Sequence, residues 1–421
     1  MIELLKTYFL KKRQLIYAYL ILLVFICFPI SHLFLSISTI SLSLFFFIDS
    51  KESLLSKWRE IKKNRVVHLY ILLLLCQILG LLYTDNLAHG IKRINTMLPL
   101  LLLPAIIFSE KFPVRYFEQM MKYLLIFIFF YFTSLIVNHT YIEGRPMNVF
   151  ALYALNENLG ISQFYMVFIL LAPLLLKLNK LLKGENILLN GLTSIALIIL
   201  IFFMTNKTSI LLVIVGIILE FINVYRNKSF LFKALSITLI LLMISVVTFS
   251  FPPISKRIDT ILKTTDFDIE IIKTKNKVTV TKNTLEHRLL INYISIKEIF
   301  NNPIFGVGTG DYQDVLNKRY KEINFKLGIL KNFNNHNQYI EEFLKTGLFG
   351  GLVFIILMFK LLNVNFYRYP NYFSLVVMFS LACFLESYLD RQHGVMIFCF
   401  FLPVFFKYDS FTLLRYMKSK K

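Results

Sequence analysis

Long apolar blocks alternate with short polar connections over most of the chain. A helix that crosses a membrane needs roughly 20 mostly apolar residues. We therefore predict an all-α membrane protein with about twelve transmembrane helices. The predicted spans lie at residues 14–30, 33–49, 66–83, 94–109, 122–138, 161–176, 187–204, 209–224, 233–250, 339–360, 371–386 and 394–406.

Basic residues gather in every second connection, for example in 51–65 and 177–183, and are sparse in the short connections between. Such alternation orients a membrane protein with its basic loops inside, which predicts that both termini are cytoplasmic. The alternation also accounts for the net charge of +21, from 46 Lys and Arg against 25 Asp and Glu, without a nucleic-acid partner. The composition, 57% hydrophobic and 17% charged, excludes a soluble enzyme, a disordered chain and a disulfide-stapled secreted domain.

One extramembrane segment is long, and it divides the chain into three parts. Residues 1–250 would hold the first nine spans, 251–338 a large outward-facing loop, and 339–421 the last three spans with a basic cytoplasmic tail. Within the loop, the Lys- and Thr-rich stretch 256–283 suggests a surface excursion that could include a short β-hairpin. A helix is predicted at about 285–301, capped by Thr284, lying along the membrane surface or roofing a cavity.

A glycine-rich turn follows this predicted helix, with glycines at 306, 308 and 310. It follows a helix, whereas a dinucleotide-binding turn follows a strand. We therefore expect Gly306 and Gly308 to let the backbone approach a phosphate or a packed helix.

A run of hydrogen-bonding side chains, 334–339, leads into the tenth predicted span. Buried polar side chains are costly unless they are solvated or bound to something polar. His336 within this run is suited to accept a proton near neutral pH. The alternative is a hydrated helix start capped by asparagine.

Charged residues at the outer ends of the predicted spans are the other candidates for chemistry. Lys207 lies between two apolar blocks, either on a substrate path or simply in a short outer turn. Arg391 belongs to a second polar group, in which an ion pair between Glu386 and Arg391 without a chemical role is the alternative. Lys92, Arg93 and Arg145 are expected to be solvated.

Several outer cations and one base, without a metal-ligand cluster, suit a diphosphate leaving group and metal-free group transfer. No cofactor is implied by any motif in the chain, and the four cysteines fall inside predicted spans as buried apolar residues.

The stretch RLLINYISIKEIFNNPIFGVGTGDY followed by NNHNQYIEEFLKTGLFGG resembles the signature of the O-antigen ligase and O-antigen polymerase superfamily. The residues that carry the resemblance are Arg288, Pro303, Gly306, Gly308, Gly310, Tyr312, His336, Asn337, Tyr339, Gly347 and Gly350. The layout of about a dozen spans with one large loop before the last few is also similar to that family.

The resemblance implies a polytopic glycosyltransferase of the bacterial inner membrane that takes a glycan from undecaprenyl diphosphate at the periplasmic face without a metal. His336 would be the base and Arg288 would hold the diphosphate. Asn337, Tyr339, Arg391, Gly306 and Gly308 are expected to bind substrate. Lys207 stands where the family commonly has an arginine, and lysine lacks the bidentate fork of that residue.

An O-antigen ligase passes the glycan to lipid A–core, and we favour this activity. The alternative is a polymerase that joins lipid-linked repeat units. A transporter or flippase of lipid-linked glycans is the alternative from another class, but its cations should be distributed through the bundle. Here the polar residues are concentrated in one outer loop.

Overall fold

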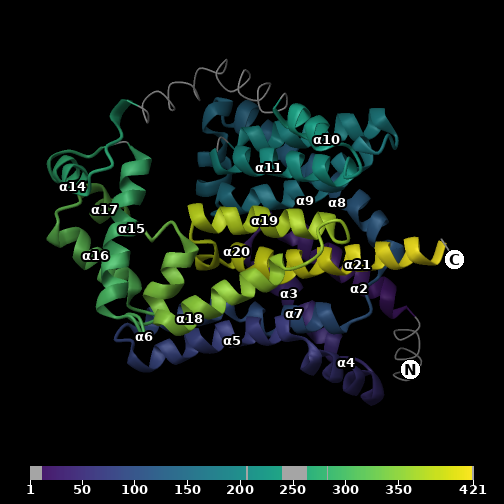
Figure 1. Cartoon of the computed structure of the whole chain (residues 1–421), viewed down its shortest axis with the longest axis horizontal. Helices are drawn as coiled ribbons and strands as arrows, with labels where there is room; N and C mark the ends of the chain where they lie inside the picture. Colours follow the sequence, from purple (N-terminus) through teal and green to yellow (C-terminus); the bar gives the residue numbers. More distant parts are fainter. Residues whose placement is uncertain (1–11, 205–206, 239–262, 282, 420–421) are drawn as a thin grey trace.

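The computed structural model describes residues 12–204, 207–238, 263–281 and 283–419, and all regular structure in these ranges is helical. Most helices run side by side along one axis, and four helices gather across one end of this bundle (Figure 1). The predicted all-α fold is therefore confirmed. The four end helices are α14 (Ile269–Val278), α15 (Thr284–Asn301), α16 (Tyr312–Glu322) and α17 (Lys326–Lys331).

Within the described ranges, six helical segments are long and apolar enough to cross a membrane, or seven if one strongly bent pair is counted as a span. The bent pair is α3 (His32–Phe47) and α4 (Lys51–Lys63), with 113° between them. The six long segments are α5 with η1 (Arg65–Leu79, Gly80–Tyr83), α6 with α7 (Leu87–Met97, Pro99–Ser109), α8 with η2 (Val114–Val137, Asn138–Ile142), α9 (Gln163–Leu182), α18 (Gln338–Leu362), and α20, η6 and α21 together (Gln392–Met396, Ile397–Phe401, Leu402–Ser419).

Four predicted spans coincide with helices that are apolar but shorter. These are α2 (Arg13–Cys27), α10 (Ile187–Phe203), α11 (Lys207–Val224) and α19 (Pro370–Leu385). The predicted span 233–250 lies mostly outside the described residues, so the total of twelve stays a prediction. Three short segments lie between these helices: η3 (Met147–Val149), η4 (Ala151–Glu157) and η5 (Tyr388–Asp390).

The start of α2, the end of α21 and helix α4 lie at one end of the bundle, and α14–α17 lie at the other (Figure 1). A chain whose two ends share a side must cross the bundle an even number of times. The predicted cytoplasmic placement of both termini stays a prediction.

The outer segment differs from the sequence prediction in two details. Residues 269–278 form helix α14, so no β-hairpin occupies the described part of 256–283. Helix α15 is capped by Asn283, whose side chain accepts hydrogen bonds from the backbone N–H groups of Leu285 and Glu286, instead of by Thr284. Asparagine is one of the strongest helix caps, and it precedes the predicted one by a single position.

The glycine turn packs backbone against backbone on helix α18. Val307 N–H donates to the Leu344 carbonyl at 2.8 Å, and Leu348 N–H donates to the Pro303 carbonyl at 2.9 Å. The helix kinks there at Gly347, which has φ 61° and ψ −152°. A Cβ on Gly306 would lie 2.6 Å from the Gly347 nitrogen, so this approach requires glycine. Gly306 thus packs against a helix, one of the two expected roles, and the predicted contacts of Gly306 and Gly308 with a phosphate stay predictions.

Candidate active site

A polar cavity of about 550 Å³ lies at the end of the bundle that carries α14–α17. Its lining comes from α6, the start of α9, the start of α16, the end of α17 with the segment that leads to α18, and the connection between α19 and α20. The lining residues are His89, Lys92, Arg93, Thr96, Ser162, Phe164, Tyr165, Gln313, Lys331, Asn332, Phe333, Asn334, His336, Glu386, Asp390 and Arg391. Two of the residues predicted from the sequence, His336 and Arg391, therefore share one cavity.

The His336 ring is held by a carboxylate. Its Nδ1 lies 2.9 Å from Glu386 Oε1. An ionised carboxylate only accepts, so Nδ1 carries the proton of the neutral ring and Nε2 keeps its lone pair. No partner of Nε2 is found among the described residues. A histidine whose tautomer is fixed by a carboxylate in this way is arranged as a general base.

Glu386 also contacts Arg288, the other residue predicted to be catalytic. Arg288 Nη2 lies 3.9 Å from Glu386 Oε2, and Nη1 donates to the carbonyl of Leu385 at the end of α19. Burial lowers the pKa of Arg288, and Glu386 acts in the opposite direction. Glu386 thus lies between His336 and Arg288, and the considered ion pair between Glu386 and Arg391 does not form. No ion pair of Arg391 is found in the described part of the chain.

Asp390 joins the cavity to a buried group of charges. It binds Arg93 of α6, Lys345 Nζ of α18 at 3.1 Å and Asn334 Nδ2 at 2.7 Å. Burial would raise the pKa of Asp390, but Arg93 and Lys345 hold it well below its ordinary value. The expectation that Arg93 is solvated is wrong, because its side chain is buried against this carboxylate.

The structure places Asn337 and Tyr339 inside the protein framework. The Asn337 side-chain oxygen caps α18, accepting from Tyr339 N–H at 3.0 Å and Ile340 N–H at 3.2 Å. The Tyr339 hydroxyl lies 2.7 Å from Ser380 Oγ, so this ring faces α19. Neither residue lines the polar cavity, and their predicted contacts with substrate stay predictions.

Lys207 is the first residue of α11, and its side chain lies outside the described part of the structure. The register of α11 against α19 nevertheless places its backbone. Gly216 faces Met378, and Ser374 Oγ lies 3.4 Å from Glu220 Oε1, so the two helices are antiparallel. Lys207, at the start of α11, therefore lies toward the end of α19 that leads to Glu386. Residues 205 and 206, which precede it, lie outside the described residues.

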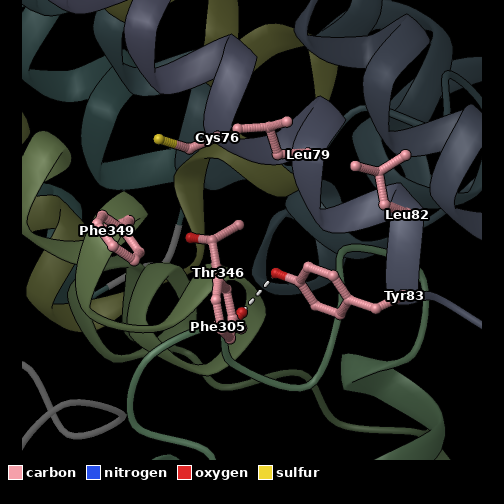
Figure 2. Close-up of a pocket in the computed structure, with 7 residues that line it drawn as sticks. All are labelled: Cys76, Leu79, Leu82, Tyr83, Phe305, Thr346 and Phe349. Carbon is pink, nitrogen blue, oxygen red and sulfur yellow. Dashed lines mark hydrogen bonds between the residues drawn. The ribbon is translucent and has the colours of Figure 1, made fainter.

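An apolar cavity of about 720 Å³ flanks the glycine turn on α5, η1 and α18, and its lining is Cys76, Leu79, Leu82, Tyr83, Phe305, Thr346 and Phe349. Figure 2 shows the Tyr83 hydroxyl pointing to the Phe305 carbonyl, to which it donates a hydrogen bond. The turn connects the two cavities: Phe305 lines the apolar one, and the Gly310 carbonyl contacts His89 of the polar one.

The comparison with known protein families agrees with the sequence motif around Arg288, the glycine turn and His336. Residues 193–355 match the model of the O-antigen ligase family. The resemblance to the O-antigen ligase superfamily is confirmed. No curated protein matches the chain significantly. The O-antigen ligase family points to a glycosyltransferase of the ligase or polymerase type, and its match and the apolar helices together indicate a multi-pass bacterial membrane protein.

The segment that matches the O-antigen ligase family contains Lys207, Arg288, the glycine turn and His336. His89, Glu386 and the other cavity residues of α6 and of the α19–α20 connection lie outside it. The sequence predicted Glu386 as part of a polar group, but not as the hydrogen-bond partner of His336. Lys92 was predicted only as a solvated cation, and His89 and Lys331 were not predicted as residues of the site. No group of three or more His, Cys, Asp or Glu side chains able to hold a metal occurs in the described ranges.

Proposed function

We propose that this protein is an O-antigen ligase, a glycosyltransferase that moves a glycan from undecaprenyl diphosphate to lipid A–core at the periplasmic face of the inner membrane. The observation that carries the proposal is the bond of His336 Nδ1 to Glu386 in a cavity lined by unpaired cations. Lys92, Lys331 and Arg391 line that cavity, and no ion pair is found for them among the described residues.

The chemistry needs a base on the acceptor and positive charge on the leaving group. His336 Nε2 takes the proton of the acceptor hydroxyl while that oxygen bonds to the anomeric carbon. The bond from this carbon to the phosphate oxygen breaks, and undecaprenyl diphosphate leaves with the electron pair. In-line attack inverts the anomeric carbon. The charge that develops on the diphosphate is stabilised by the three unpaired cations of the cavity, together with Arg288 and Lys207.

The hydrocarbon of the donor has a suitable place beside the glycine turn. The apolar cavity is bounded by two helical segments that are long and apolar enough to cross a membrane. A lipid chain can enter such a cavity from the bilayer without exposing apolar surface to water. The donor would then have its chain on one side of the turn and its charged group on the other.

The same geometry serves a polymerase, which differs only in the acceptor. Deleting the gene and examining the lipopolysaccharide separates the two activities. A ligase predicts the loss of all long glycan chains from the core while lipid-linked polymer accumulates. A core capped by single repeats indicates the polymerase, and unchanged lipopolysaccharide would remove both.

The proposal includes the predicted orientation of the chain in the membrane. Both termini would be cytoplasmic, 251–338 would form the periplasmic loop that carries Arg288 and His336, and membrane lipids would surround the spans. The polar cavity lies at one end of the bundle and does not run through it, which supports an enzyme over a transporter.

A further inference from the structure

A second histidine in the polar cavity has its tautomer fixed. His89 Nδ1 lies 2.7 Å from the carbonyl oxygen of Gly310. A carbonyl oxygen only accepts, so Nδ1 carries the proton and the lone pair of the neutral ring is on Nε2. The part of the chain that the structure describes offers no partner for this Nε2. His89 thus has the same protonation pattern as His336.

The position of the His89 ring is fixed by the glycine turn. The carboxylate of Asp311, at the end of that turn, accepts hydrogen bonds from the N–H groups of Asp85 and Asn86 at 2.8 and 2.7 Å. Asn86 in turn caps α6 by accepting from His89 N–H. The ring stacks on Tyr312 with 5.7 Å between centroids. A Cβ on Gly310 would lie 2.3 Å from the Asn86 carbonyl, so only glycine allows this approach.

Helix α6 presents four polar residues to the cavity, and one of them, Arg93, is already paired with Asp390. His89, Lys92 and Thr96 all line the cavity, one turn apart. Thr96 Oγ1 donates to the Lys92 carbonyl of its own helix. His89 and Lys92 are therefore the two side chains of this face that can bind a ligand, one as a neutral acceptor and one as a cation.

We propose that His89 is a glycan-binding residue, in which Nε2 accepts a hydrogen bond from a hydroxyl of the sugar attached to the diphosphate. This inference rests on the proposed function. The choice of the sugar follows from the tautomer, because sugar hydroxyls donate, whereas diphosphate oxygens only accept. Lys92, one turn further along α6, contacts the phosphate. The glycine turn would thus orient a sugar-binding side chain through the Gly310 carbonyl.

Two substitutions separate this role from a structural one. In His89→Asn the side-chain amide can reach the Gly310 carbonyl in place of Nδ1, but nothing replaces Nε2. In His89→Gln the longer side chain places its amide near the position of Nε2. A residue that only supports the fold should tolerate asparagine better. A residue that binds the sugar should tolerate glutamine better.

The test compares two ligands on the full chain in nanodiscs: undecaprenyl diphosphate, and the lipid-linked glycan that accumulates in the deletion strain. The wild-type protein should bind the glycosylated lipid more tightly. His89→Asn should reduce this preference about tenfold, as expected for one neutral hydrogen bond, while His89→Gln keeps most of it. Lys92→Gln is the matched control and should weaken both ligands by the same factor.

The outcomes distinguish this inference from the proposed function. An unchanged preference in His89→Asn, or no preference in the wild-type protein, would overturn the glycan-binding role even if transfer to lipid A–core occurs. A preference that depends on His89 without any transfer would support the subsite and count against the ligase. If no lipid-linked glycan accumulates in the deletion strain, both proposals fail.

Discussion

His336 has a backbone conformation that side chains rarely adopt. Its φ is 48°, in the left-handed region that costs a non-glycine residue roughly 1 kcal/mol. Asn334 holds this conformation, since its Oδ1 accepts from His336 N–H at 3.2 Å and its Nδ2 donates to Asp390. The candidate base is therefore positioned by protein contacts alone, before any substrate binds.

Glu386 should matter to transfer through His336. In Glu386→Gln the amide can favour the wrong tautomer of the ring, so we expect the rate of glycan transfer to fall by about 10²- to 10⁴-fold. Transfer from lipid-linked glycan to lipid A–core in a purified assay measures this. Thr96→Ala, in the same cavity, should keep near wild-type activity because its hydroxyl bonds within its own helix. Equal losses in both variants would mean that Glu386 only maintains the cavity.

For the side chains of the candidate site, the sequence predicted the residue types better than their hydrogen-bond partners. His336 and Arg288 could be selected from a polar run and a motif near the span that follows. Glu386 lies 50 positions beyond His336, and Gly310 lies 221 positions beyond His89. Local spacing carries no signal for such pairs, because only the packing of α6, α18 and α19 brings them together.

Helix α15 illustrates how tertiary contacts decide which face of an element is buried. Its bounds agree with the prediction, yet apolar Tyr293, Ile296 and Phe300 are exposed and polar Glu298 is buried. Glu298 pairs with Arg319 of α16 at 2.8 Å. The ion pair lets Glu298 pack inward on the same face as buried Leu290 and Ile291. A second apolar stripe stays outside, as a helix that lies along a membrane surface would have.

The kink of α18 should be intolerant of any side chain. In Gly347→Ala the new Cβ would lie 2.2 Å from the Ile304 carbonyl oxygen in addition to the strain of φ 61°. We expect a loss of several kcal/mol of stability, more than the roughly 1 kcal/mol for positive φ alone. Thermal unfolding in detergent measures this. Gly144→Ala is the control, with φ 64° and no neighbouring atom within 4 Å of its Cβ. Equal shifts in melting temperature would contradict the packing of the turn on the kink.

Helix α4 should lie in the plane of the membrane. It bends 113° from α3 and exposes Leu55 and Trp58 on one face, with Lys62 Nζ 5.5 Å from the indole ring. Apolar and basic residues arranged in this way favour the headgroup region. Trp58 is the only tryptophan of the chain, so the fluorescence reports this helix alone. Lipids brominated near the headgroup should quench it more than lipids brominated at the chain end, and the opposite order would place α4 elsewhere.

The topology of the whole molecule can be tested with thiol reagents, because all four native cysteines are buried. Glu157→Cys, at the predicted periplasmic side, should react with an impermeant maleimide in intact spheroplasts. Lys63→Cys, at the end of α4, should react only after lysis. Both positions are exposed in the structure. Labelling of both in intact cells, or of neither, would refute the predicted orientation.

Transfer should also survive removal of divalent ions from the whole enzyme. Charge on the leaving group is proposed to be stabilised by Lys92, Lys331 and Arg391, so EDTA should leave the rate of transfer unchanged. A loss that Mg²⁺ or Mn²⁺ restores would mean that the cations of the cavity are insufficient. Triple substitution of these cations by glutamine should abolish transfer under either condition.

The ion pair of Arg93 with Asp390 has a consequence for how the chain is made. The two residues lie 297 positions apart. Arg93 belongs to the long apolar segment of α6 and α7, and Asp390 lies in the connection that precedes the last such segment. At about 5–20 residues per second, Arg93 waits on the order of 15–60 s for its partner to be synthesised. A lone arginine inside a bilayer costs roughly 2.5–3.5 kcal/mol, and a long side chain lowers this by reaching the surface. Insertion of the early helices must therefore tolerate a charge whose acidic partners, Glu341 and Asp390, are both made much later.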